Sequence, residues 1–260
     1  MVVVRQDGTG DFSTIGDVVA AAPNSTDVGG GYYVIYVVAG VSQEYVSVGS
    51  SQTYVMMNGV GIGQTVITGS RNFADGWTTF NRATFAGVGT GFVAVGITIQ
   101  NTAGAAKYQA VAVRNGADLS TFYCCSFKGY QDTLYTHSLR QFYKECDIYG
   151  TVDFIFGNAA VVFQNCNIYP RLPMVGQYNT ITAQGRTDLS QNTDTSIQNC
   201  NITAASDVAS SNGTVKTFLG RPWMEYSRTV YMFSFMDSLI DLAGWSVWSG
   251  DFVLNTLYYA

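Results

Sequence analysis

A repeated pattern centred on cysteine constrains the fold of this 260-residue chain more than any other feature of its sequence. Four segments read large apolar residue, two residues, Cys, one residue, large apolar residue. They are Phe122–Phe127, Tyr143–Ile148, Phe163–Ile168 and Ile197–Ile202, and Val230–Phe235 continues the pattern without cysteine. The cysteines at 125, 146, 166 and 200 are 21, 20 and 34 residues apart. A period of about 20 to 50 residues is typical of solenoids and propellers.

The residues inside each repeat indicate strands rather than helices. Short runs of Phe, Tyr, Val, Ile and Thr favour β-structure, and the pattern of a leucine-rich repeat is absent. We therefore predict an all-β chain in the form of a parallel β-helix, with about 20 residues in a coil and longer coils carrying inserted loops. The step from the first apolar residue to Cys breaks strict alternation, which indicates a bend between two strands of the same coil.

The N-terminal third is less regular but similar. A segment from Asp11 to Ala22 has apolar residues at helical spacing, with Asp11 as a candidate cap and Pro23 beyond its end. We predict one short helix here that covers the open end of the solenoid. The predicted strands are Tyr32–Val38, Val55–Val60, Thr65–Thr68 and Val93–Gln100.

The register of the cysteines raises the question of disulfides. Equivalent residues of stacked coils lie about 4.8 Å apart, which is within the range of Cα separations that a disulfide spans. The preferred pairing is Cys125–Cys146 with Cys166–Cys200, and the rival is Cys146–Cys166. Cys124 is one residue out of register and is predicted to be unpaired. A further alternative is that all five cysteines are small buried apolar residues.

Composition excludes several classes of protein. Hydrophobic residues make up 47% and charged residues only 12%, which excludes a disordered chain. The net charge is −5 and no polybasic run is present, which argues against nucleic-acid binding. No apolar stretch approaches the roughly 20 residues of a membrane span. Abundant uncharged polar side chains suggest a carbohydrate ligand, and sequons at Asn24, Asn201 and Asn212 permit secretion.

The same register places two acidic residues together. Asp132 and Asp153 each lie seven residues after a cysteine of the repeat, so they occupy the same place on adjacent coils. The strand spacing puts them within about 5 Å of each other. Two carboxylates this close do not both ionise freely, so we expect the pKa of one to rise. Such asymmetry suits a nucleophile paired with a general acid.

Other polar residues converge on this place. Gln109 and Gln131 are 22 residues apart, and their amide N–H groups are candidates for stabilising an oxyanion. Arg221 is one of only 13 basic residues, and an arginine beside an aspartate orients it. The structural alternatives stay open at this point: Asp132 in an Asx-turn, and Asp153 in a buried ion pair with Arg221.

Four ordered motifs bear a family resemblance. Gly129–Tyr135, Asp153–Ala159, Leu219–Trp223 and Gln109–Arg114 resemble the signature segments of plant-type pectin methylesterases (pectinesterases), and the likeness extends from Val3 to Tyr259. It implies a right-handed parallel β-helix forming a single domain over residues 1–260. It also implies a C-terminally shortened domain, because family members usually continue some tens of residues further.

The resemblance assigns a role to each matching residue. Asp153 matches the nucleophile and Asp132 the general acid/base, while Gln131 and Gln109 match the residues that stabilise the oxyanion. Arg221 matches the partner of the nucleophile. Thr79 and Trp223 match substrate contacts, and Gln109 and Arg221 are assigned to substrate binding as well. Tyr135, Phe156 and Trp248 are expected to line the substrate groove. No metal or other cofactor is implied, and the single histidine, His137, cannot form a histidine-based metal cluster.

The function implied is removal of methyl groups from methyl-esterified homogalacturonan, with release of methanol. The implied protein is a secreted monomer of the cell wall, with a proteinaceous pectinesterase inhibitor as a partner. The alternative is a catalytically impaired β-helix that only binds pectin. Retention of Asp132, Asp153, Gln131 and Arg221 argues against it, and the motifs of pectate lyases and polygalacturonases are absent.

Overall fold

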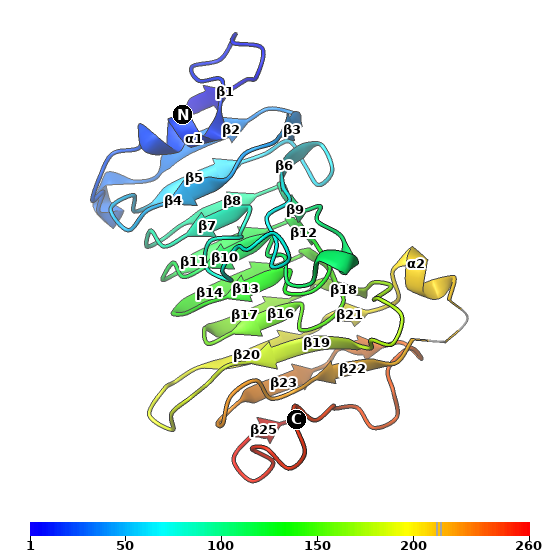
Figure 1. Ribbon diagram of the computed structural model, residues 1–260. Coiled ribbons are helices and arrows are strands. Elements are labelled where there is room, and N and C mark those ends of the chain that lie inside the picture. Colours follow the sequence, from blue (N-terminus) through cyan, green and yellow to red (C-terminus); the bar gives the residue numbers. More distant parts are fainter. Residues whose placement is uncertain (212, 214) are drawn as a thin grey trace.

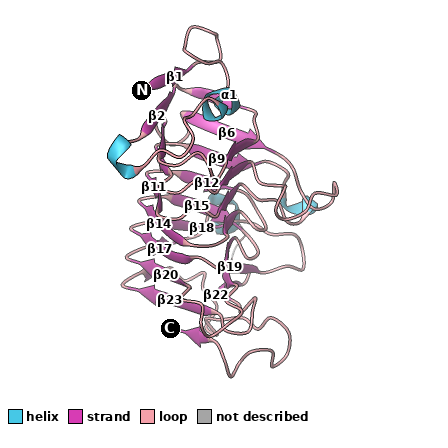
Figure 2. Ribbon diagram, turned by 90° about the vertical axis from the view of Figure 1, so that its left-hand side faces the viewer, coloured by secondary structure: helices cyan, strands magenta, loops and turns pink. Residues whose placement is uncertain are grey.

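The computed structural model describes residues 1–211, 213 and 215–260. Its strands lie one above another in a single stack, with the two termini at opposite ends (Figure 1). Successive coils are joined by parallel pairing, for example β11 to β14 and β12 to β15. Seen from the side, the strands form the walls of an elongated solenoid (Figure 2). The predicted parallel β-helix is therefore confirmed.

The described residues form three parallel sheets, and a regular coil contributes one strand to each of them. The ten-stranded sheet contains β1 (Val2–Val4), β2 (Tyr33–Val37), β5 (Val55–Asn58), β8 (Val93–Val95), β11 (Ser120–Tyr123), β14 (Arg140–Lys144), β17 (Ala160–Gln164), β20 (Asp194–Gln198), β23 (Arg228–Met232) and β25 (Tyr258–Tyr259). The seven-stranded sheet contains β4 (Val46–Val48), β7 (Phe85–Gly87), β10 (Val113–Asn115), β13 (Leu134–Thr136), β16 (Ile155–Gly157), β19 (Asn179–Gln184) and β22 (Thr217–Gly220). The eight-stranded sheet contains β3 (Gly40–Ser42), β6 (Thr65–Gly69), β9 (Thr98–Asn101), β12 (Ser126–Lys128), β15 (Asp147–Gly150), β18 (Asn167–Pro170), β21 (Asn201–Ile202) and β24 (Phe235–Met236).

The helices are short, and the N-terminal one differs from the prediction. The helical segments are α1 (Ile15–Ala20), η1 (Val28–Gly30), η2 (Ala105–Lys107) and α2 (Ser206–Ala209). Helix α1 packs against β1 and β4 at the N-terminal end of the stack, as expected. It begins later than predicted because Thr14, not Asp11, accepts the capping hydrogen bond from the backbone N–H of Asp17. Asp11 instead accepts from the N–H of Val3.

The bend in each coil has a repeated backbone conformation. The residue before each repeat cysteine lies in the left-handed region, which turns the chain from the ten-stranded to the eight-stranded sheet. These residues are Cys124, Glu145, Asn165 and Asn199, with φ of 50°, 54°, 55° and 52°. The predicted strand Val93–Gln100 is divided in the same way, at Gly96, into β8 and β9.

Aromatic side chains stack along the interior. Phe122, Tyr143 and Phe163 are partners in adjacent strands, with ring centroids 5.0 Å and 4.8 Å apart. All three are fully buried. Each such pair contributes about 0.5–1.5 kcal/mol beyond the burial of its area. In-register stacking of identical positions therefore holds one coil against the next and sets the register of the site residues.

The disulfide prediction is wrong, since all five cysteines are free. Cys146 Sγ donates to the carbonyl of Phe122 at 3.4 Å, and Cys166 Sγ to that of Tyr143 at 3.5 Å. In-register stacking keeps equivalent side chains parallel at about the strand spacing, whereas a disulfide needs Cβ atoms about 3.8 Å apart and side chains turned toward each other. The structure contains none of the three pairings considered, Cys125–Cys146, Cys166–Cys200 and Cys146–Cys166. The four repeat cysteines are buried, which agrees with the alternative that they are small apolar residues. Cys124 is also free, as predicted, and is only partly buried.

Candidate active site

A cleft of about 350 Å³ lies on the outer side of the seven-stranded sheet. Nine of the ten residues predicted for the site line it, and Ala183 completes its wall. The nine are Thr79, Gln109, Gln131, Asp132, Asp153, Phe156, Arg221, Trp223 and Trp248. The tenth, Tyr135, stands beside the cleft with its ring stacked on that of Phe156 at 4.4 Å.

The two aspartates occupy equivalent places on adjacent coils, as their spacing predicts. Leu134 of β13 pairs with Ile155 of β16, and each aspartate lies two residues before its strand. The backbone N–H of Asp132 donates to the carbonyl of Val152, which joins the two turns. Both aspartates have positive φ, 63° and 51°, a conformation that aspartate tolerates better than most residues.

Asp153 is held by a fork of hydrogen bonds. Arg221 Nε donates to its Oδ1 at 2.8 Å and Arg221 Nη2 to its Oδ2 at 2.6 Å. The hydroxyl of Thr180 on β19 donates to Oδ1 at 2.6 Å and accepts from the Asp153 N–H. Bidentate, charge-assisted bonds fix the orientation of a carboxylate. Arg221 also contacts an aromatic ring, since its guanidinium lies 4.4 Å from the ring centroid of Trp248.

Asp132 is in a different electrostatic state. Its carboxyl is buried, and no side-chain hydrogen bond to it exists among the described residues. Burial, followed by the like charge of Asp153, raises the pKa of Asp132 well above its ordinary value, although Arg82 and Arg221 act in the opposite direction. Asp132 therefore keeps its proton to higher pH than an exposed aspartate, while the neighbouring Asp153 is ion-paired. This is the asymmetry expected from the sequence.

The glutamines and aromatic residues complete the walls. Gln131 precedes Asp132, and its carbonyl accepts from Ala110 on the previous coil, beside Gln109. Gln109 lines the cleft, and its Oε1 is buried with no partner among the described residues. The ring of Trp223 packs over Gly185, where an added β-carbon would come within 2.7 Å of it.

Two contributors to the site were missed by the sequence analysis. Thr180 belongs to no recognisable sequence motif. Its role in holding Asp153 is seen only in the structure, where β19 lies next to the turn that contains Asp153. Arg82 is buried and donates to the hydroxyl of Thr79 at 2.9 Å and to the carbonyl of Gln109 at 3.0 Å. Its charge also favours ionised Asp132. The available signal was its position three residues after Thr79 in a chain with few cations.

Substitution of Arg82 should displace the pH dependence of activity. Arg82 lowers the pKa of Asp132, so Arg82→Met raises that pKa further and moves the alkaline limb of kcat/KM to higher pH, by about one unit. Arg82→Lys keeps the charge and should leave the limb near its wild-type position. An unchanged limb in Arg82→Met, in a sample with a cooperative melt, would exclude this electrostatic role.

Comparisons with known proteins agree with the fold. A pectinesterase family model matches residues 1–260. "Probable pectinesterase/pectinesterase inhibitor 7" of Arabidopsis thaliana is 65% identical over all of this chain and 45% of its own length. "Pectinesterase 2" of Citrus sinensis is 60% identical, over 100% of this chain and 50% of its own. The solved pectin methylesterase from carrot is 55% identical, with a TM-score of 0.97, over 99% of this chain and 80% of its own.

Fold and site together define a parallel β-helix protein with a paired-carboxylate cleft. The chain belongs to the pectinesterase family. It spans about half the length of the curated relatives that it matches.

Proposed function

We propose that this protein is a carboxylic ester hydrolase that removes methyl groups from methyl-esterified homogalacturonan. The observation that carries the proposal is one cleft in which Asp153 is oriented by Arg221 while buried Asp132 retains a proton. An ion-paired carboxylate beside a carboxylic acid is what nucleophilic attack and protonation of a leaving group require. Membership of the pectinesterase family supports the same substrate.

The reaction proceeds by acyl transfer. Asp153 attacks the ester carbonyl, and the amides of Gln109 and Gln131 donate to the tetrahedral oxyanion. The intermediate collapses to an acyl-enzyme anhydride as Asp132 gives its proton to the departing methoxide, which leaves as methanol. Ionised Asp132 then takes a proton from water, which attacks the galacturonate carbonyl of the anhydride. Asp153 leaves as a carboxylate, and the galacturonic acid that is formed loses its proton to solvent to give the free carboxylate.

The aromatic residues of the cleft serve as substrate contacts in this proposal. Tyr135, Phe156, Trp223 and Trp248 place apolar ring surface and polar edges around the two carboxylates. Aromatic residues pack well against the apolar parts of sugar rings. Thr79, held by Arg82, adds a hydroxyl. No step of this mechanism needs a metal ion or another cofactor.

Methanol release from methyl-esterified pectin, measured together with polymer length, tests the proposal. We expect methanol without any shortening of the chain. Shortening without methanol would indicate a lyase or glycosidase instead. Binding without either reaction would leave only the pectin-binding alternative.

We also infer where the protein acts and with what. A single unit over residues 1–260 is consistent with the continuous sheets. An extracellular location in the cell wall is consistent with exposed asparagines in the sequons at Asn24 and Asn201. The monomeric state is proposed from the family resemblance alone. The sequon at Asn212 lies outside the described residues. In the part of the chain that the structure describes, no helix has the length and apolar character to cross a membrane. A proteinaceous inhibitor as partner is suggested by the paired name of the Arabidopsis relative.

A further inference from the structure

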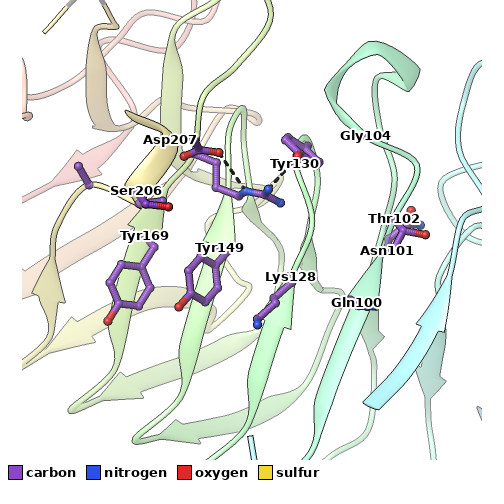
Figure 3. A pocket seen from close by; sticks show the side chains of 13 residues that line it. Gln100, Asn101, Thr102, Gly104, Lys128, Tyr130, Tyr149, Tyr169, Ser206 and Asp207 are labelled. Carbon is purple, nitrogen blue, oxygen red and sulfur yellow. Dashed lines mark hydrogen bonds and ion pairs between the residues drawn. The ribbon is translucent and has the colours of Figure 1, made fainter. Parts of the chain in front are cut away.

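A second hollow lies on a different wall of the β-helix. It has a volume of about 660 Å³ and is formed over the outer side of the eight-stranded sheet, whereas the catalytic cleft is on the seven-stranded sheet. Strands β9, β12, β15 and β18 form its floor. The loop around Thr102–Gly104 and the start of α2 form its rims (Figure 3). A hollow of this size is in the range of ligand sites.

The floor of this groove is a single in-register row. Gln100, Lys128, Tyr149 and Tyr169 are partners on four successive coils. Adjacent members are separated by about 4.8 Å, the spacing of strands in a sheet. Lys128, Tyr149 and Tyr169 point the same way, with the ammonium and both hydroxyls at the same level (Figure 3). The row therefore offers hydrogen-bonding groups at regular intervals along the long axis of the molecule, which suits a polymer with a short repeat.

The charge of the groove favours an anion. Among the described residues, no carboxylate lies within 4 Å of Lys128 Nζ, which is 5.5 Å from the ring centroid of Tyr149. The other cation, Arg171, donates to the hydroxyl of Tyr130 at 2.7 Å and lies 3.5 Å from Asp207. Among the residues that the structure describes, Asp207 is the only carboxylate that lines the groove, and it is in that ion pair. The lining thus has one unbalanced positive charge in a chain of net charge −5.

The two tyrosines form a preorganised pair. Their rings are stacked with centroids 4.6 Å apart and planes inclined by 19°. Burial, followed by the charge of Asp147, raises the pKa of Tyr149 to about 12. Asp147 lies outside the lining and accepts a hydrogen bond from the Asn167 side chain at 2.9 Å. The hydroxyl of Tyr149 therefore stays protonated at physiological pH and can donate to a ligand oxygen.

We propose that this groove binds a demethylesterified stretch of galacturonan, the anionic product of the proposed reaction. Each unit of that polymer carries one carboxylate and several hydroxyls. Lys128 pairs with a free carboxylate but gains no charge interaction with a neutral methyl ester. Tyr149, Tyr169 and Gln100 exchange hydrogen bonds with the sugar hydroxyls. The choice of ligand rests on the proposed function; the geometry of the groove does not.

Calorimetric titration with unesterified pentagalacturonate tests the proposal. Wild-type protein should show binding that Lys128→Met weakens at least about fivefold, and that high salt also weakens. Lys144→Met is a matched control, since Lys144 lies 6.0 Å from the Tyr123 ring centroid on the ten-stranded sheet, another wall. It should bind as wild type does. Trp223→Ala changes the catalytic cleft and should retain the Lys128-dependent binding. Thermal melts show whether each variant is folded.

The outcomes separate the groove from the proposed activity. Equal binding of the unesterified oligomer by wild type and Lys128→Met would overturn the groove proposal even if methanol is released. So would equal Lys128-dependent binding of the fully methyl-esterified oligomer, measured in Asp153→Ala protein so that the ester is not hydrolysed during the titration. Lys128-dependent binding of the unesterified oligomer alone would support it. If that binding persists while wild-type protein releases no methanol, the groove is supported as an oligogalacturonate site and the proposed function fails.

Discussion

Replacing Asp153 by Asn is expected to reduce the rate of methanol release at least about a thousandfold. The amide occupies the same space as the carboxylate but cannot attack an ester. The change appears in kcat, because the acyl-enzyme no longer forms. Asp153→Ala should behave in the same way and cannot revert to aspartate by deamidation. Methanol release from esterified pectin measures both.

Loss of folding is the main competing explanation for such a result, and a matched variant addresses it. Arg140 holds Asp118 by the same fork, with Nε–Oδ1 at 3.0 Å and Nη2–Oδ2 at 2.6 Å, on the surface away from the cleft. Asp118→Asn breaks an equivalent ion pair and should keep near wild-type turnover. Retention of turnover by Asp153→Asn and Asp153→Ala would exclude Asp153 as the nucleophile.

The register of the coils could be predicted from sequence because it depends on a periodic signal. Apolar residues recur at the same place in each coil, and a shift of one residue would turn each interior side chain outward. The spacing of 21 residues therefore predicts that Asp132 lies beside Asp153, and the pairing of β13 with β16 agrees. Gln109 and Gln131 followed by the same argument. Residues fixed by register are the ones that sequence predicts well.

The register of the coils does not determine which way a side chain points or which residue caps a helix. Equivalent cysteines are adjacent, but their thiols donate to backbone carbonyls instead of joining. The start of α1 depends on which oxygen reaches an N–H group, and Thr14 does so. Arg82 reaches the cleft because its side chain bonds to the carbonyl of Gln109 and the hydroxyl of Thr79. The sequence contains no periodic signal for these contacts.

Asp132→Asn is expected to lower activity about 10²- to 10⁴-fold, because it removes the general acid and base. The same change should make the protein more stable at neutral and higher pH. The folded-state pKa of Asp132 is raised above its unfolded value, so the unfolded chain loses this proton at lower pH than the folded chain does. The stabilising contribution of protonated Asp132 is present below the unfolded pKa and is lost as pH rises through the folded pKa.

An asparagine at position 132 stays neutral, so it avoids this loss. The melting temperature of Asp132→Asn should exceed that of wild type at pH 8 by at least about 3 °C, and the difference should shrink as pH falls toward 4. Asp118→Asn should change the melting temperature at pH 8 in the opposite direction. The pKa of Asp118 is lowered, first by its hydrogen bond with Arg140, so its carboxylate stabilises the fold above the unfolded pKa. Asp118→Asn should therefore melt below wild type at pH 8. A lower melting temperature for Asp132→Asn at every pH would contradict the buried, destabilising carboxylate on which the proposed acid depends.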